Sequence, residues 1–123
     1  ACIKTVKCVQ KDDAPEIMEK LRRADVLIFA TPIYYYEMCG QMKALLDRMN
    51  PLYSSDYAFR EVYMIATADA TFEMAYNGLQ GWVDCFPKAK LCGLVAGEEI
   101  GDPKDAVNHP DVMEKAYELG KAL

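Results

Sequence analysis

An uninterrupted apolar segment, Val26 to Ala30, limits the fold of this chain more than any other feature. A run of this kind without polar alternation is typical of a strand that is covered on both faces, as in a parallel sheet. Pro32 has no N–H group to donate to a sheet, so we predict a strand over residues 25–31 and a loop from Pro32 to Gly40. In open α/β sheets, ligands bind at the carboxyl ends of the strands, so this loop is the first place to look for a site.

Helical and strand-like segments alternate along the rest of the chain. Apolar residues at helical spacing predict helices over residues 13–24, 40–50, 71–86 and 111–123. Two further apolar runs predict strands over residues 61–67 and 90–96. This order predicts an α/β fold with right-handed crossovers and a parallel sheet. Because three strands alone make a poorly covered sheet, and because the chain begins with Ala1-Cys2, we expect residues 1–123 to be a single domain that is incomplete at its N-terminus.

Composition excludes several classes of function. A chain of 123 residues with 52% hydrophobic residues has enough apolar side chains for one core. The net charge is −5 and the basic residues do not cluster, which argues against nucleic-acid binding. No apolar run approaches the roughly 20 residues that a membrane-spanning helix needs. The N-terminus lacks the pattern of a signal peptide, so we expect a cytoplasmic location and no membrane partner.

The chain contains an odd number of cysteines, which argues for free thiols rather than a disulfide framework. They are Cys2, Cys8, Cys39, Cys85 and Cys92. We interpret the last three as small buried apolar side chains. His109 is the only histidine, and the proline that follows it suits the first position of a helix, so we interpret His109 as a residue at a helix start.

One stretch carries a family resemblance. Thr31-Pro32-Ile33-Tyr34, followed by Gly40-x-x-Lys43-x-x-x-Asp47-Arg48, resembles the corresponding motif of the NADPH-dependent FMN reductase family. The resemblance implies a flavodoxin-like, three-layer α/β/α fold with a parallel sheet, present here without its first strands. It also implies FMN as the cofactor and NAD(P)H as the co-substrate. In this family the loop that binds the FMN phosphate lies in the part that would precede Ala1.

The resemblance further implies which residues contact the flavin. The loop after the strand over residues 25–31 should wrap the isoalloxazine ring, with the exit loop of the neighbouring strand on its other side. A flavin needs flat apolar contacts and main-chain donors and acceptors, which these segments provide. The expected cofactor-binding residues are Thr31, Pro32, Ile33, Tyr34, Tyr35, Tyr36, Thr67, Ala68 and Asp69. Tyrosines are also enriched at protein interfaces, so Tyr34 to Tyr36 fit a dimer contact as well.

Two cysteines leave an alternative open. Cys2 and Cys8, followed by Lys11-Asp12-Asp13, resemble the end of the compact cysteine motif of iron–sulfur flavoproteins. A [4Fe–4S] cluster needs four thiolates, and the other two would precede Ala1. The alternative is therefore an iron–sulfur flavoprotein that carries electrons.

The leading hypothesis is an NAD(P)H-dependent FMN oxidoreductase that forms a homodimer or homotetramer. Electrons would pass through FMN to a small acceptor, which is a quinone, a free flavin, an azo or nitro compound, or a metal ion. No catalytic acid or base is expected, since the cofactor carries the redox chemistry. A third, non-enzymatic hypothesis is that the chain holds no flavin.

Overall fold

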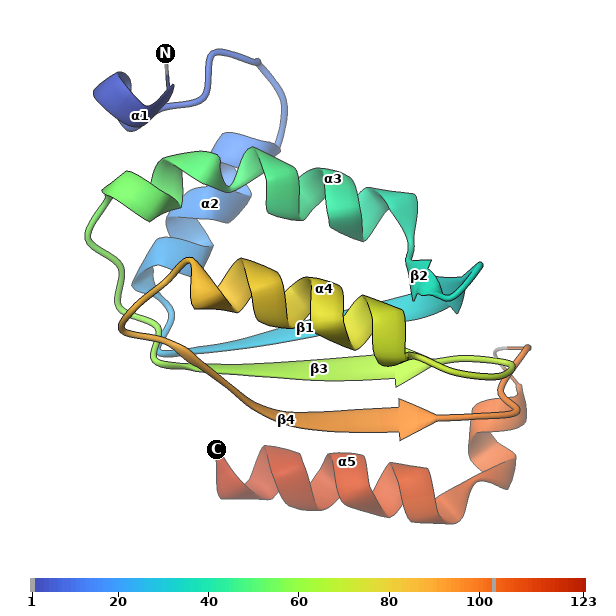
Figure 1. Ribbon diagram of the computed structural model, residues 1–123. Coiled ribbons are helices and arrows are strands. Elements are labelled where there is room, and N and C mark those ends of the chain that lie inside the picture. The colour runs from blue at the N-terminus through green and yellow to red at the C-terminus, as the bar shows by residue number, and fades with distance from the viewer. Residues whose placement is uncertain (1, 103) are drawn as a thin grey trace.

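The computed structural model describes residues 2–102 and 104–123, without the side chain of Ile3. Figure 1 shows helices and strands alternating along the chain, as expected. The elements are α1 (Cys2–Thr5), α2 (Ala14–Arg23), β1 (Val26–Tyr34), β2 (Glu37–Met38), α3 (Gly40–Arg48), η1 (Asn50–Ser54), β3 (Glu61–Thr67), α4 (Glu73–Asp84), β4 (Lys90–Gly97), η2 (Asp105–Asn108) and α5 (Pro110–Ala122).

The sheet has the strand order β2-β1-β3-β4. β1 and β3 pair in parallel from Val26–Glu61 to Pro32–Thr67, and β3 and β4 also pair in parallel. Helices α3 and α4 lie over one face of the sheet and α5 lies over the other, next to β4 (Figure 1). The three layers and the mainly parallel sheet confirm the predicted fold class. In the described residues, no helix is both long and apolar enough to cross a membrane.

The predicted end of the first strand is wrong. β1 continues through Pro32 to Tyr34 and then folds back as β2, with Ile33 opposite Met38 and Tyr34 opposite Glu37. The proline is tolerated because, among the described residues, β2 pairs only with Ile33 and Tyr34. Pro32 therefore has β3 as its strand neighbour on one side and a free edge on the other, where a missing N–H leaves no acceptor unsatisfied.

The prediction that β1 is covered on both faces is also wrong for the described chain. Burial alternates along the strand: Leu27, Phe29 and Thr31 are buried, whereas Ile28 is 47% exposed. The buried side chains face the core that includes residues of α3 and α4. The opposite face stays open at β1 because α5, the helix on that side, packs against β4.

An aromatic cluster joins β1, α4 and the segment before β3. The ring centroids of Tyr57 and Phe59 lie 4.4 Å apart, and those of Trp82 and Phe86 lie 4.5 Å apart. Phe29 meets Trp82 edge-on at 5.5 Å. Such pairs contribute about 0.5–1.5 kcal/mol each beyond the area that they bury. The cluster holds the amino-terminal half of the sheet against α4, which leaves the other edge of the sheet to the exit loops of the strands.

Candidate functional site

The end of β1, the end of β3 with its exit loop, and the exit loop of β4 meet at one edge of the sheet and line a cavity of about 450 Å³, which we call the edge cavity. Loops at the carboxyl ends of neighbouring parallel strands lie side by side, which is why this edge gathers them. The edge cavity is lined by Pro32, Ile33, Tyr34, Thr67, Ala68, Asp69, Ile100, Gly101, Asp102 and Ala106. The structure thus brings together both segments that were expected to contact a flavin.

Two main-chain hydrogen bonds fasten the exit loops of β3 and β4 to each other. The amide of Ala68 donates to the carbonyl oxygen of Gly97 at 2.9 Å, and the amide of Ile100 donates to the carbonyl oxygen of Ala68 at 3.1 Å. Ala68 and Ile100 are both buried. The wall of the edge cavity formed by these loops is therefore part of the hydrogen-bonded fold.

The lining suits a planar ring with apolar faces and a polar rim. Pro32, Ile33 and Ile100 supply apolar surface, and the loops supply main-chain donors and acceptors. Gly101 leaves open space at the cavity, because a Cβ built on it would have no atom within 4 Å. An isoalloxazine ring has the same combination of flat apolar faces and a polar edge, so the residues present fit it.

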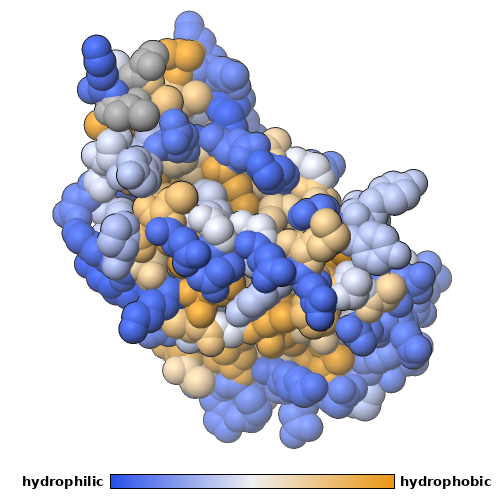
Figure 2. Space-filling model, in the orientation of Figure 1, coloured by the Kyte–Doolittle hydropathy of each residue, from blue (hydrophilic) through white to orange (hydrophobic). Residues whose placement is uncertain are grey.

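The turn between β1 and β2 forms the rim of a second, smaller cavity. Tyr35 and Tyr36 are the two residues of the turn, and both have positive φ, 51° and 69°. This cavity of about 230 Å³, which we call the tyrosine chamber, is lined by Ile33, Tyr35, Tyr36, Ala68, Asp69, Ala70 and Thr71. In Figure 2, pale side chains project from the molecule at the place where Figure 1 draws this turn. The three consecutive tyrosines are therefore divided, with Tyr34 in the edge cavity and the other two in the tyrosine chamber.

Thr31, which was expected to contact the flavin, has a structural role here. It is buried, and its Oγ1 accepts a hydrogen bond from the amide of Cys39 at 3.1 Å. The same hydroxyl donates to the carbonyl oxygen of Pro32 at 2.9 Å. Thr31 thus links the start of α3 to the end of β1, next to the hairpin that β1 forms with β2.

Aspartates supply the charge at this edge of the sheet. Asp69 lines both cavities and Asp102 lines the edge cavity. Among the described residues that line the two cavities, there is no lysine, arginine or histidine. The crevice therefore has a negative bias and suits a neutral or cationic ring better than an anionic one.

The sequence reasoning missed the third wall of the edge cavity. Ile100, Gly101, Asp102 and Ala106 come from the segment after β4, which sequence patterns identify only as a turn-rich loop. The signal was available, because this loop follows the third predicted parallel strand and must leave the sheet at the same edge as the other two.

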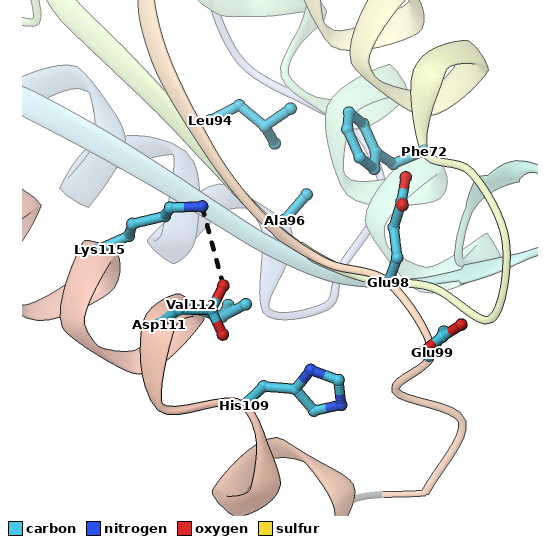
Figure 3. A pocket seen from close by; sticks show the side chains of 9 residues that line it. All are labelled: Phe72, Leu94, Ala96, Glu98, Glu99, His109, Asp111, Val112 and Lys115. Carbon is cyan, nitrogen blue, oxygen red and sulfur yellow. Dashed lines mark ion pairs between the residues drawn. The ribbon is translucent and has the colours of Figure 1, made fainter.

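A larger cavity, about 530 Å³, lies elsewhere, between the end of β4 and α5. Figure 3 shows Glu98, Glu99 and His109 around this hollow, while Lys115 turns to Asp111 at 3.9 Å. His109 directly precedes α5, which confirms the expected position at a helix start. We assign the candidate site to the edge cavity because residues of or directly after β1, β3 and β4 line it. Among the described residues that line the larger cavity, β4 is the one strand represented.

The amino-terminal cysteines lie against the end of α3. Cys8 Sγ accepts a hydrogen bond from Arg48 Nη2 at 3.3 Å, and Cys2 Sγ accepts one from Asn50 Nδ2, also at 3.3 Å. Asp12 pairs with the same guanidinium. Hydrogen bonds from the amide of Gln10 and from Arg48 lower the pKa of Cys8. Two thiols are half of what a [4Fe–4S] cluster needs, and the described residues contain no group of three or more metal-binding side chains, so these residues alone do not fit a cluster.

The other three cysteines are less buried than predicted. Cys85 and Cys92 are exposed and Cys39 is half-buried. Cys85 follows the last turn of α4, and Cys92 lies near the start of the edge strand β4.

Comparison with known proteins identifies the family of this chain. Residues 1–77 match the family model described as NADPH-dependent FMN reductase. An iron–sulfur flavoprotein of Methanosarcina thermophila is 42% identical over 60 residues, which are 49% of this chain and 31% of that protein. An FMN-dependent NADH:quinone oxidoreductase of Burkholderia pseudomallei is 29% identical over 98 residues, or 80% of this chain and 40% of that protein.

The match to an iron–sulfur flavoprotein of Archaeoglobus fulgidus, 40% identical over 50 residues, covers 41% of this chain and 23% of that protein. The chain therefore spans well under half the length of these curated relatives. The solved structure of the Trp repressor binding protein from Bacillus subtilis superposes with a TM-score of 0.73 at 24% identity, over 87% of this chain and 70% of that one. This likeness shows a shared flavodoxin-like fold.

Proposed function

Because the chain belongs to the NADPH-dependent FMN reductase family, we propose that it binds FMN in the edge cavity and acts as an NAD(P)H-dependent oxidoreductase. For an organic two-electron acceptor A the overall reaction is NAD(P)H + H⁺ + A → NAD(P)⁺ + AH₂, and for a metal ion that takes one electron it is NAD(P)H + 2 Mⁿ⁺ → NAD(P)⁺ + H⁺ + 2 M⁽ⁿ⁻¹⁾⁺. The acceptor is a small molecule: a quinone, a free flavin, an azo or nitro compound, or a metal ion. Bound FMN supplies the redox chemistry, by taking a hydride from the nicotinamide and passing the electrons on.

The observation that carries this proposal is that the ends of β1 and β3 and the loops after β3 and β4 meet around one cavity. Its volume of about 450 Å³ lies within the range of roughly 300–1,000 Å³ that is usual for ligand sites. In the proposal, Pro32, Ile33 and Ile100 contact the faces of the ring and shield it from water. Tyr34 covers its outer side. The main-chain groups of residues 67–69 and 100–102 hold its polar edge.

A cavity-filling variant tests the proposal. Gly101 lines the edge cavity, and a Cβ built on it meets no atom within 4 Å, so Gly101→Leu adds a bulky side chain at the cavity wall without a clash at its Cβ. We expect FMN binding, followed by the quenching of flavin fluorescence, to weaken by at least an order of magnitude. Gly120→Leu is the matched control, because Gly120 lies in α5, also with open space around it.

Equal FMN affinity in the two variants would refute this position of the flavin. Far-ultraviolet circular dichroism and the midpoint of thermal unfolding, measured on both variants, separate a filled cavity from a disturbed fold.

The second candidate is an iron–sulfur flavoprotein. It is favoured by the positions of Cys2 and Cys8, whose sulfur atoms both contact the segment between Arg48 and Asn50. In this candidate the two thiolates are part of a cluster whose other ligands come from outside the described residues. Iron and sulfide analysis of anaerobically purified protein, with its visible spectrum, distinguishes the candidates: about four irons and four sulfides per chain support the cluster.

The proposal includes assembly into a homodimer or homotetramer and action in the cytoplasm. The exposed rings of Tyr34 and Tyr35 at the mouth of the crevice are the kind of side chain that contacts between copies bury. Light scattering at several protein concentrations tests the assembly.

A further inference from the structure

We infer that a cavity at the amino-terminal end of the sheet binds a small organic phosphate, which is a phosphate group joined to a compact organic body. This cavity, which we call the basic cavity, has a volume of about 400 Å³. It is lined by Arg22, Arg23, Asp56, Tyr57, Ala58, Arg60 and Lys88. The inference does not rest on the proposed function, because none of these residues lines the edge cavity.

The segments that lead into the parallel strands bring the basic side chains together. Arg22 and Arg23 end α2, Arg60 directly precedes β3, and Lys88 lies just before β4. Figure 1 shows these segments at the end of the sheet that is opposite the strand exits. The amide of Ala58 donates to the carbonyl oxygen of Arg22 at 2.8 Å, which fixes the segment before β3 against the end of α2. Cations that are scattered along the sequence therefore line one cavity in the folded chain.

The charges of the basic cavity do not cancel. Its four cations are accompanied by two carboxylates: Asp56, which pairs with Lys88 at 2.9 Å, and Glu19, which does not line the cavity. Glu19 pairs with Arg22 at 2.8 Å and with Arg23 at 2.6 Å. Four positive and two negative charges leave a surplus of two positive charges. A phosphate monoester carries nearly two negative charges at neutral pH, so its charge matches this surplus.

Arg60 is held in a way that leaves its charge available. Its Nη1 donates to the carbonyl oxygens of Tyr57, Ala58 and Phe59, at 3.1, 2.7 and 2.9 Å. These acceptors are neutral, and in the described part of the chain no carboxylate forms an ion pair with Arg60. Its Nε and Nη2 groups, which lie on the same side of the guanidinium, have no hydrogen-bond acceptor there either. Two parallel N–H donors on a fixed guanidinium are the arrangement that binds a phosphate group in bidentate fashion.

The size of the basic cavity favours an organic phosphate over a bare phosphate ion. A volume of about 400 Å³ lies within the range of roughly 300–1,000 Å³ that is usual for sites of small organic molecules. Tyr57, Ala58 and the methylene groups of the arginines provide apolar surface beside the charged groups. A phosphate group on Arg60 therefore leaves room for the organic body to which it is joined.

Asp56 is the group with which such a ligand has to compete. Its side chain is 87% exposed, and the pKa of its carboxyl is lowered, mainly by the hydrogen bond from Lys88 and also by the charge of Arg60. Asp56 thus faces the cations that we assign to the phosphate. The edge cavity has the opposite character, because Asp69 and Asp102 line it without a cation among its described residues. A small anion is therefore attracted to the amino-terminal end of the sheet.

Calorimetric titration with three matched anions tests the inference. Phenyl phosphate is a dianion at about pH 8, phenyl sulfate has the same ring with one negative charge, and inorganic phosphate lacks the ring. The titrations are made on the purified chain without FMN, at low ionic strength. We expect one phenyl phosphate to bind per chain, several-fold more tightly than either of the other two anions.

Substitutions of the lining residues should change the affinity in opposite directions. Arg60→Gln should weaken phenyl phosphate binding roughly 10-fold and Lys88→Gln roughly 3-fold, because each removes a cation. Asp56→Asn should strengthen it several-fold, since it removes the competing carboxylate. Lys43→Gln is the matched control, because Lys43 forms an ion pair with Asp47 on α3, outside the basic cavity, and it should leave the affinity unchanged. Lys88→Gln and Asp56→Asn alter only an exposed ion pair, so they test the site even if Arg60→Gln fails to fold.

Equal affinity for phenyl phosphate in Lys88→Gln, Asp56→Asn and Lys43→Gln would overturn the inference. A loss of binding in Gly101→Leu would also overturn it, by placing the anion in the edge cavity. Equal affinity for phenyl phosphate and inorganic phosphate would refute the contact with an organic body, and equal affinity for phenyl sulfate would refute the match of charge. Because the titrations contain no FMN, a failure of the protein to bind FMN would refute the proposed function and leave this result unaffected.

Discussion

The amide of Ala68 donates a hydrogen bond to the carbonyl oxygen of Gly97, across 2.9 Å, at the point where β3 and β4 leave the sheet. Ala68 in turn accepts a hydrogen bond from Ile100, so three residues from two loops form one connected wall of the edge cavity. The wall depends on a close approach of Ile100 to Gly97, because a Cβ on Gly97 would collide with Ile100 Cδ1. The site is therefore sensitive to a single methyl group that does not line it.

Gly97→Ala should accordingly weaken FMN binding without contacting the ligand. The added methyl group forces the end of the Ile100 side chain, which lines the edge cavity, to move, and overpacking of this kind costs about 1–3 kcal/mol of stability. Gly81→Ala is the matched control, since Gly81 lies in α4 with open space around it and should gain up to about 1 kcal/mol. Urea unfolding and FMN titration of both variants give the two quantities. A Gly97→Ala protein with unchanged FMN affinity would show that the loop after β4 does not shape the site.

The turn of the hairpin should trade stability for binding. Replacing Tyr35 by Asn and Tyr36 by Gly provides the residues that positive φ at both positions favours, so the free energy of unfolding should rise by about 1 kcal/mol or more. If Tyr35 and Tyr36 contact the flavin, as the family resemblance implies, the same double variant should bind FMN more weakly. Chemical denaturation measures the first effect and FMN titration the second. A loss of stability would mean that the tyrosine rings make contacts that outweigh the backbone strain.

Phe59 should be one of the most costly side chains to remove. It is fully buried and contacts Tyr57, Trp82 and Phe86 through its ring. Phe59→Ala should lower the free energy of unfolding by about 3–5 kcal/mol. Tyr53→Ala, at an exposed position nearby in sequence, should change it by less than about 0.5 kcal/mol. If the two variants had similar stability in urea, the segment before β3 would be peripheral to the core.

Acid should destabilise α2 through Glu19. Hydrogen bonds from Arg22, and then from Arg23, lower the pKa of Glu19 from 4.5 to about 2. Because the folded-state pKa lies below the unfolded one, this stabilisation is fully present above about pH 4.5 and is lost as the pH falls toward 2. Glu19→Gln should flatten the fall of the thermal midpoint in that window, compared with Glu114→Gln on exposed α5. If the thermal midpoint of Glu19→Gln fell with pH below 4.5 as steeply as that of the unsubstituted protein, the pH dependence would be due to other carboxylates.

Several features of the structure were readable in the order of residues. The runs at residues 26–30, 61–67 and 90–96 became the three parallel strands, because apolar segments of that length and composition are buried as strands between helices. The placement of residues 32–34 and 67–69 around one cavity followed from the rule that parallel strands present their exit loops at the same edge.

Other features depended on what lies nearby in space. From the sequence, residues 51–60 look like an exposed polar connection. Leu52, Tyr57 and Phe59 are nevertheless buried. The rings of Tyr57 and Phe59 pack against Trp82 of α4 and Phe86 just after it. The pairing of Arg48 with Asp12 and Cys8 joins groups that are 36 and 40 residues apart. No local sequence pattern predicts either contact, because each joins elements that lie close together only in the folded chain.

By itself, the sequence determined the class of fold, the edge of the sheet where the candidate site lies, and two of the three segments that line it, since periodicity and strand order are local properties. Only the tertiary structure decided that Pro32 stays in β1, that Tyr34 separates from Tyr35 and Tyr36, and that Ile100 to Asp102 close the edge cavity. The physical reason is that these outcomes are set by strand register, by a free sheet edge and by the close approach of distant backbone segments. None of these can be predicted from residues that are neighbours in the sequence.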